Sequence, residues 1–179
     1  MQYQIKRVHN ITKTQKIIFI ALLVAQAIVL SIIEKMIPLN FSVPGAKLGL
    51  ANIITLTSIY IFSFREAFFI IILRTIMTSF ILGSFSSFLY SVAGAILSFF
   101  VMYTLILISR EKISIIGVSL VGAVFHNLGQ LLVAMVIIQN AKIMYYLPLL
   151  MISGVGTGFV VGVCVKYLLG FIKKLKHFN

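Results

Sequence analysis

Long apolar runs follow one another along this chain and limit what it can fold into. Residues 113–138, for example, form a segment long enough to cross a hydrocarbon core of about 30 Å as a helix. Hydrophobic residues make up 61 % of the sequence, compared with roughly 45–50 % in soluble domains. In lipid, the backbone hydrogen bonds of each run must be made within that run, which requires a helix. The sequence therefore predicts an all-α integral membrane protein.

Prolines, glycines and charged residues divide the chain into about six predicted transmembrane helices in one bundle. These helices are predicted at residues 17–37, 48–62, 65–82, 88–109, 113–138 and 144–169. The loop after the first helix, residues 38–47, carries two prolines and a glycine and is expected to be ordered in turns. The predicted organisation is a basic cytoplasmic arm (1–16), a six-helix transmembrane domain (17–170) and a basic cytoplasmic tail (171–179).

Basic residues are distributed unevenly between the two sides of the predicted bundle. The predicted inner side holds Lys6, Arg7, Lys13, Lys16, Arg65, Arg110, Lys112, Lys166, Lys173, Lys174 and Lys176. The outer side holds Lys35, Lys47 and Lys142, and Arg74 is left within the membrane. Because cytoplasmic loops are enriched in Lys and Arg, we expect a multi-pass cell-membrane protein with both termini in the cytoplasm. The net charge of +12 then reflects this rule and anionic membrane lipid, and no nucleic-acid partner is expected.

Acidic residues are too few for several kinds of chemistry. The chain has three of them, Glu34, Glu66 and Glu111, and no aspartate. Prenyl synthases, kinases and two-metal enzymes hold magnesium with clustered carboxylates, and no phosphate-binding loop of the Walker type occurs. The lone Cys164 offers neither a disulfide nor a thiolate metal site. We therefore predict no enzyme activity, no metal and no cofactor.

Three polar residues stand in the middle of the apolar segment 113–138. His126 and Gln130 are four residues apart and share one helix face, with Asn127 beside them. A polar group in hydrocarbon costs several kcal/mol unless it is paired. Two interpretations stay open: the cluster makes hydrogen bonds between helices, or it lines a solute pocket, since ionisable residues at membrane depth usually mark substrate paths.

Other polar residues fall at a similar depth. With a rise of about 1.5 Å per residue, Arg74, Asn52, Glu34 and Lys47 all lie from the midplane outward. They predict a substrate pocket that opens to the outside under the loop 38–47. Arg74 is suited to clamp a carboxylate or phosphate at two points; the alternatives are an ion pair with Glu34 or hydrogen bonds to helix-end carbonyls. Asn52 is alternatively an interhelical hydrogen bonder, and Lys47 a solvated interface charge.

Small residues recur four apart on the first and last predicted helices. Ala21 and Ala25 lie on the first, and Gly154, Gly158 and Gly162 form a ridge on the last. Such spacing lets helix backbones approach closely. The glycine ridge therefore predicts a tightly packed pair of helices.

Three stretches together resemble a known family: residues 21–25 (ALLVA), 45–53 (GAKLGLANI) and 126–130 (HNLGQ). They are similar to the Gx transporter family, whose members are often labelled heptaprenyl diphosphate synthase component I, and to S-components of energy-coupling-factor (ECF) transporters. The resemblance implies a subunit in a bacterial plasma membrane that captures a small solute, such as a vitamin or an isoprenoid- or quinone-related precursor. It also implies docking through Ala21 and Ala25 on an ECF coupling transmembrane subunit that is driven by two ATPases.

Two other functions remain open. A non-catalytic membrane accessory protein of isoprenoid (heptaprenyl diphosphate or quinone) metabolism would use Arg74 and His126 to contact a diphosphate. A structural scaffold would use every intramembrane polar group for packing, and it predicts no stabilisation by a solute.

Overall fold

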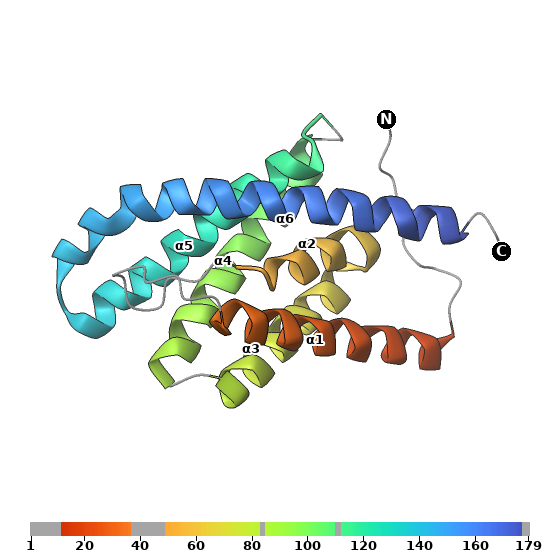
Figure 1. Ribbon diagram of the computed structural model, residues 1–179, viewed down its shortest axis with the longest axis horizontal. Coiled ribbons are helices and arrows are strands. Elements are labelled where there is room, and N and C mark those ends of the chain that lie inside the picture. Colours follow the sequence, from red (N-terminus) through yellow and green to blue (C-terminus); the bar gives the residue numbers. More distant parts are fainter. Residues whose placement is uncertain (1–11, 37–48, 83–84, 110–111, 177–179) are drawn as a thin grey trace.

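The computed structural model describes residues 12–36, 49–82, 85–109 and 112–176, and these residues are helical almost throughout. In chain order the elements are α1 (Lys13–Met36), α2 (Asn52–Ile61), α3 (Phe64–Leu82), α4 (Phe85–Ser109), α5 (Ile115–Ile138), the short 3-10 helix η1 (Ala141–Tyr146) and α6 (Leu147–Lys176). The predicted all-α fold class is confirmed for these residues, and Figure 1 shows the helices as one bundle.

Four segments of the described chain are long and apolar enough to cross a membrane. They are Lys13–Glu34, Phe85–Ser109, Ile115–Ile138 and Ala141–Lys174. The other two helices differ: α2 has 10 residues, about 15 Å of helix, and α3 carries Arg65, Glu66 and Arg74. The structure thus supports a multi-pass membrane protein, while the count of six spans stays a prediction.

Several helix ends differ from their predicted positions. Helix α1 begins at Lys13, earlier than the predicted residue 17, because Thr12 and Gln15 form a capping box: the Thr12 N–H donates to the Gln15 side chain (3.0 Å) and the Gln15 N–H to the Thr12 hydroxyl (3.3 Å). Helix α4 begins at Phe85 rather than at 88. Helix α6 continues to Lys176, into the predicted tail.

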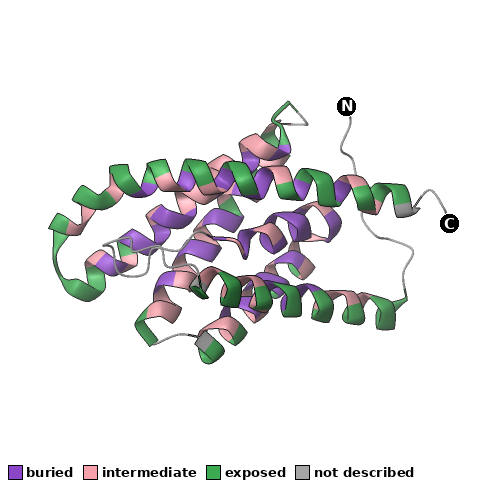
Figure 2. Ribbon diagram, in the orientation of Figure 1, coloured by how far each residue is buried: buried purple, intermediate pink, exposed green. Residues whose placement is uncertain are grey.

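The short helix α2 lies in the middle of the bundle and packs against α1, α3, α4 and α6. Figure 2 shows it almost entirely in the colour of buried residues. Leu56 of α2, Phe99 of α4 and Val165 of α6 are all fully buried in the core around it. Helix α2 also begins at Asn52 and not at the predicted residue 48, so its N-terminus lies inside the protein.

Helices α5 and α6 pack closely along the glycine ridge, as predicted. A Cβ atom added to Gly158 would lie 2.9 Å from Ala123 Cβ and from Leu120 Cα. One added to Gly162 would lie 2.8 Å from Ile116 Cα. Real Cβ contacts are essentially never this short, so the two backbones meet at a distance that larger side chains would prevent.

Large apolar side chains cover the outer faces of the bundle. Ile18 on α1 is 61 % exposed and Phe159 on α6 is 54 % exposed, and Figure 2 shows these two helices with long exposed faces. A soluble monomer rarely exposes so much apolar surface, so these faces fit contact with lipid.

The ends of the bundle can be distinguished by the chain path. The first turn of α1 and the last turn of α6 lie toward one end, and η1 lies at the opposite end (Figure 1). An ion pair of 2.6 Å between Lys16 Nζ and a Glu66 carboxylate oxygen joins the start of α1 to the start of α3. The Ser63 N–H also donates to Glu66 (3.0 Å). Glu66 therefore both caps the N-terminus of α3 and binds α1.

Candidate solute-binding site

The α2–α3 hairpin brings Asn52 and Arg74 together. Ser63 lies in the turn of the hairpin. Asn52 and Arg74 are equally far from it along the chain, one before it and one after it. Both therefore lie about 15 Å from the turn. Arg74 Nη2 donates a long hydrogen bond of 3.4 Å to Asn52 Oδ1.

Arg74 is a buried cation whose hydrogen bonding is incomplete. The residue is only 5 % exposed, and its Nε atom has no hydrogen-bond partner among the described residues. Glu34 on α1 is close enough to act on it electrostatically, and the ion-pair alternative for Arg74 stays a prediction. A buried guanidinium with an unsatisfied N–H group is costly unless something completes its contacts.

Glu34 also caps the N-terminus of α2. Its carboxylate oxygens accept hydrogen bonds from the backbone N–H groups of Gly49 (2.7 Å) and Leu50 (3.2 Å). The N-cap residue Ala51 has no side chain for this purpose, so a carboxylate from another helix takes its place. Negative charge is favourable at a helix N-terminus. Glu34, Asn52 and Arg74 are thus three predicted site residues that the structure brings together.

A tight backbone turn makes this arrangement possible. Gly49 has φ +78°, a conformation that other residues rarely adopt, and an added Cβ would lie 2.9 Å from Asn52 Nδ2. Sequence reasoning did not single out Gly49. The signal was present as a glycine three residues before the polar start of a helix.

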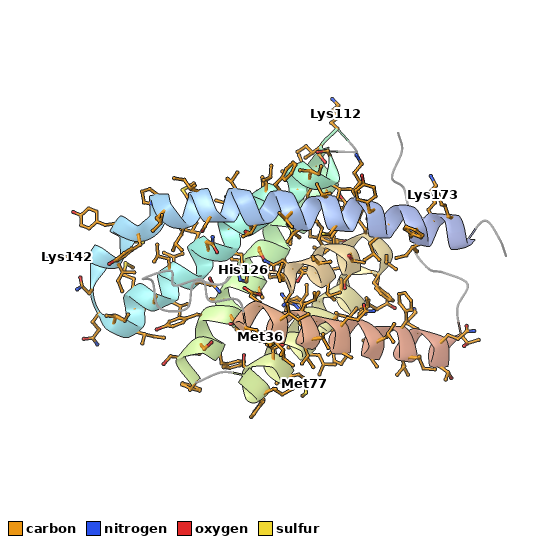
Figure 3. All side chains as sticks on the ribbon, viewed as in Figure 1. Met36, Met77, Lys112, His126, Lys142 and Lys173 are labelled. Atoms are coloured by element: carbon orange, nitrogen blue, oxygen red, sulfur yellow. The ribbon has the colours of Figure 1, made fainter. Side chains whose placement is uncertain are left out.

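The polar residues of α5 turn to two different neighbours. Asn127 Nδ2 donates to the carbonyl oxygen of Leu150 on α6 (2.7 Å), so for this residue the packing interpretation describes the contact. His126 and Gln130 instead lie against α4: a Cβ on Gly94 would lie 3.1 Å from His126 Cε1 and 2.9 Å from Gln130 Cγ. Figure 3 shows His126 in the middle of the bundle, between the ends marked by Lys142 and Lys173.

Gln130 resembles Arg74 in being buried and incompletely bonded. The residue is 5 % exposed, and its Nε2 atom has no hydrogen-bond partner among the described residues. Arg74 on α3 bonds to Asn52 on α2, whereas His126 and Gln130 lie beside Gly94 on α4. The predicted site residues therefore form two groups, one at α1–α2–α3 and one at α4–α5.

A small cavity lies between α2, α4, α5 and α6. Its polar lining consists of Asn52, Ser119 on α5 and Thr157 on α6, and Met102 on α4 contributes an apolar wall. The centre of a water molecule has about 10 Å³ to occupy, which is room for about one water. Ligand pockets for larger solutes measure about 300–1,000 Å³, so this cavity alone does not hold such a solute. It lies between Asn52 and the part of α5 that carries Ser119, Gly122 and Ala123.

Three predicted residues remain. Lys47 lies outside the described residues. Ala21 and Ala25 are exposed, while Leu23, Val24 and Ala27 on the other side of α1 are buried. Helix α1 packs against α2 and α3, so the face with the two alanines points out of the bundle.

Comparison with known proteins gives one match. The family described as heptaprenyl diphosphate synthase component I matches residues 23–168, which spans the segment from α1 to α6 and includes every residue of the two polar groups. No curated protein and no solved structure matches the chain.

Proposed function

Because this chain belongs to the heptaprenyl diphosphate synthase component I family, we propose that it is a non-catalytic membrane subunit that binds a small solute and passes it to a partner complex. The observation that carries the proposal is the state of Arg74. A buried cation at mid-membrane depth, with an Nε atom lacking a partner and a long bond to Asn52, is poorly explained by packing. A solute with an acceptor group would complete its contacts.

The resemblance to S-components of ECF transporters gives this proposal its mechanism. The solute is captured from outside near Glu34, Asn52 and Arg74, with His126, Asn127, Gln130 and Lys47 as further candidate contacts. The protein then docks on a coupling transmembrane subunit that is driven by two ATPases. The exposed face of α1 supports this part, since Ala21 and Ala25 leave a shallow apolar surface open to a partner helix.

The family description favours a second candidate, an accessory membrane protein of isoprenoid metabolism. In that case a prenyl diphosphate, held among the lipid-facing helices, would place its diphosphate on Arg74 and His126. The protein would support a separate synthase, because the sequence has no aspartate with which to build a magnesium–diphosphate site.

Co-purification separates the two candidates. The tagged chain is expressed in its host membrane and extracted in mild detergent, and the accompanying proteins and small molecules are identified by mass spectrometry. We expect a coupling subunit, two ATPases and a small solute that is released on denaturation. A prenyl synthase without the ATPases would instead support the accessory role.

Two variants tie the released solute to the site. Arg74→Gln removes the buried cation, and we expect it to lower the amount of co-purified solute by more than tenfold. Arg65→Gln, at the first turn of α3 and exposed, is the control for loss of a positive charge on the same helix and should retain the solute. Equal amounts of co-purified solute with the wild type, Arg74→Gln and Arg65→Gln would show that Arg74 does not bind the solute.

A further inference from the structure

The N-terminus of α2 is already occupied by an acidic group, and that group belongs to the protein. We propose that α2 and Arg74 form a binding site for the carboxylate or phosphate group of the solute, and that Glu34 is a built-in competitor for this site. Binding of the anionic group then displaces Glu34 and releases the outer end of α1. The inference rests on the proposed solute-binding function and adds the chemical class of the solute and a link to α1.

The groups that converge here are hydrogen-bond donors. The N–H groups of Gly49 and Leu50 point at the Glu34 carboxylate, at 2.7 and 3.2 Å. Arg74 is only 5 % exposed. It donates a hydrogen bond to Asn52, the first residue of α2. Its Nε–H lacks an acceptor among the described residues. Donors from a backbone turn and a guanidinium are matched by acidic oxygens.

Glu34 shows which chemistry the site accepts. Its carboxylate satisfies two backbone N–H groups and interacts electrostatically with Arg74, yet it leaves Arg74 Nε without a partner. An incoming acidic group with two or three oxygens could take the N–H groups of α2 and the free donor of Arg74 together. It would make more hydrogen bonds than Glu34 makes, and two carboxylates at one place repel each other, so Glu34 leaves.

Displacement of Glu34 has a structural consequence for α1. Glu34 lies in the last turn of α1, which ends at Met36, and its hydrogen bonds fasten that turn to α2. Further down, α1 is held by buried apolar residues such as Leu23 and Ala27. Loss of the Glu34 bonds therefore frees the outer turn and leaves the rest of α1 packed. The helix that carries the exposed Ala21 and Ala25 face is in this way sensitive to whether the site is filled.

The direction in which one substitution changes anion binding tests the inference. Purified protein in lipid nanodiscs is titrated with inorganic phosphate and with succinate, against chloride at equal ionic strength, and binding is read from the rise in unfolding temperature. Glu34→Gln removes the competing charge and keeps the shape, so we expect it to bind the anions about three- to thirtyfold more tightly than the wild type. Arg74→Gln should abolish the response, and Arg65→Gln should leave it unchanged.

A contrary sign would overturn the inference. If Glu34→Gln weakens anion binding, Glu34 contacts the ligand and does not compete with it, as it would for a solute that carries a cation beside its acidic group. If neither the wild type nor Glu34→Gln responds to phosphate or succinate, the site does not take acidic groups. A solute that still co-purifies with the wild type in that case would leave the proposed solute-binding function standing.

Hydrogen exchange gives an independent measurement of the link to α1. On addition of a saturating anion, the amides of the last turn of α1 should exchange faster in the wild type, because the Glu34 bonds are lost. In Glu34→Gln this turn should already exchange at a similar fast rate, and the anion should add little. Slower exchange of this turn in the wild type on anion binding would contradict the release of α1.

Discussion

Gly49 and Glu34 together do what a single capping side chain does in most helices. The left-handed turn at Gly49 (φ +78°) presents its N–H and that of Leu50 to a carboxylate from α1. A helix that starts inside a protein cannot leave these groups to water. The position of Asn52, and through it that of Arg74, therefore depends on one glycine and one acid.

Substitution of Gly49 by alanine tests this dependence. We expect Gly49→Ala to destabilise the protein by about 1–2 kcal/mol from the left-handed backbone, and by more because the new Cβ would lie 2.9 Å from Asn52 Nδ2. Thermal unfolding in detergent measures the effect. Gly156→Ala is the matched control, since nothing lies within 4 Å of its added Cβ. Equal melting temperatures for the two variants would contradict the structural role of Gly49.

Helix α5 is the element that distributes polar groups between two interfaces. Its Asn127 bonds to the α6 backbone, while His126 and Gln130 lie against Gly94 of α4. The small residues of α6 and α4 permit this, because they bring each backbone within reach of a polar side chain on α5. Close packing and polar contacts are therefore coupled at both interfaces.

A leucine in the glycine ridge should separate α5 from α6. Gly158→Leu places a side chain where a Cβ already meets Ala123 Cβ and Leu120 Cα at 2.9 Å, and overpacking of this kind costs typically about 1–3 kcal/mol. Gly156→Leu on the same helix enters open space and should cost much less. Urea or thermal unfolding of the two variants in one detergent would show the difference, and similar losses would refute the ridge as a packing contact.

The outer face of α1 allows a test of docking without a change to the solute site. Ala21→Leu with Ala25→Leu fills the shallow surface, and we expect loss of the co-purified coupling subunit and ATPases with solute binding retained. Val155→Leu with Val160→Leu, two positions about half exposed on α6, is the matched control and should keep the partners. Loss of solute and partners together in the alanine double variant would count against docking through α1.

At the scale of the whole molecule, several lysines lie at opposite ends of the bundle. Figure 3 shows Lys142 at one end and Lys173 at the other, with Lys112 also distant from Lys142. The first turn of α1 lies at the same end as the last turn of α6 (Figure 1). This arrangement fits an even number of crossings, and the positive-inside rule predicts that the end with α1 Lys13 and α6 Lys173 faces the cytoplasm.

Cysteine labelling tests this orientation, because the chain has a single cysteine. In a Cys164→Ala background, Lys142→Cys should react with a membrane-impermeant maleimide in intact cells, since η1 is expected outside. Lys173→Cys should react only after permeabilisation. The reverse pattern would overturn the predicted orientation, and labelling of both in intact cells would place the two ends of α6 on one side.

Much of the fold could be predicted from local sequence, and the misplaced helix ends have identifiable causes. The capping box of Thr12 and Gln15 was readable in the sequence, yet the charged Lys13 and Lys16 argued for a later start of α1. The short length of α2 follows from tertiary structure: Glu34, which is distant in the chain, supplies its cap. Local patterns could not show that Asn52 is the first residue of a buried helix.

The sequence by itself determined that the chain is a helical membrane protein, because long apolar runs leave the backbone no other way to satisfy its hydrogen bonds. It also predicts membrane depth for Arg74, Asn52 and the polar residues of α5, because rise per residue converts position into distance. Tertiary structure decided which polar groups meet. Helix spacing fixes which face a residue occupies, but the neighbour of that face depends on how the helices pack. In this protein Asn127 contacts α6, Gln130 lies against α4, and Glu34 binds the N-terminus of α2.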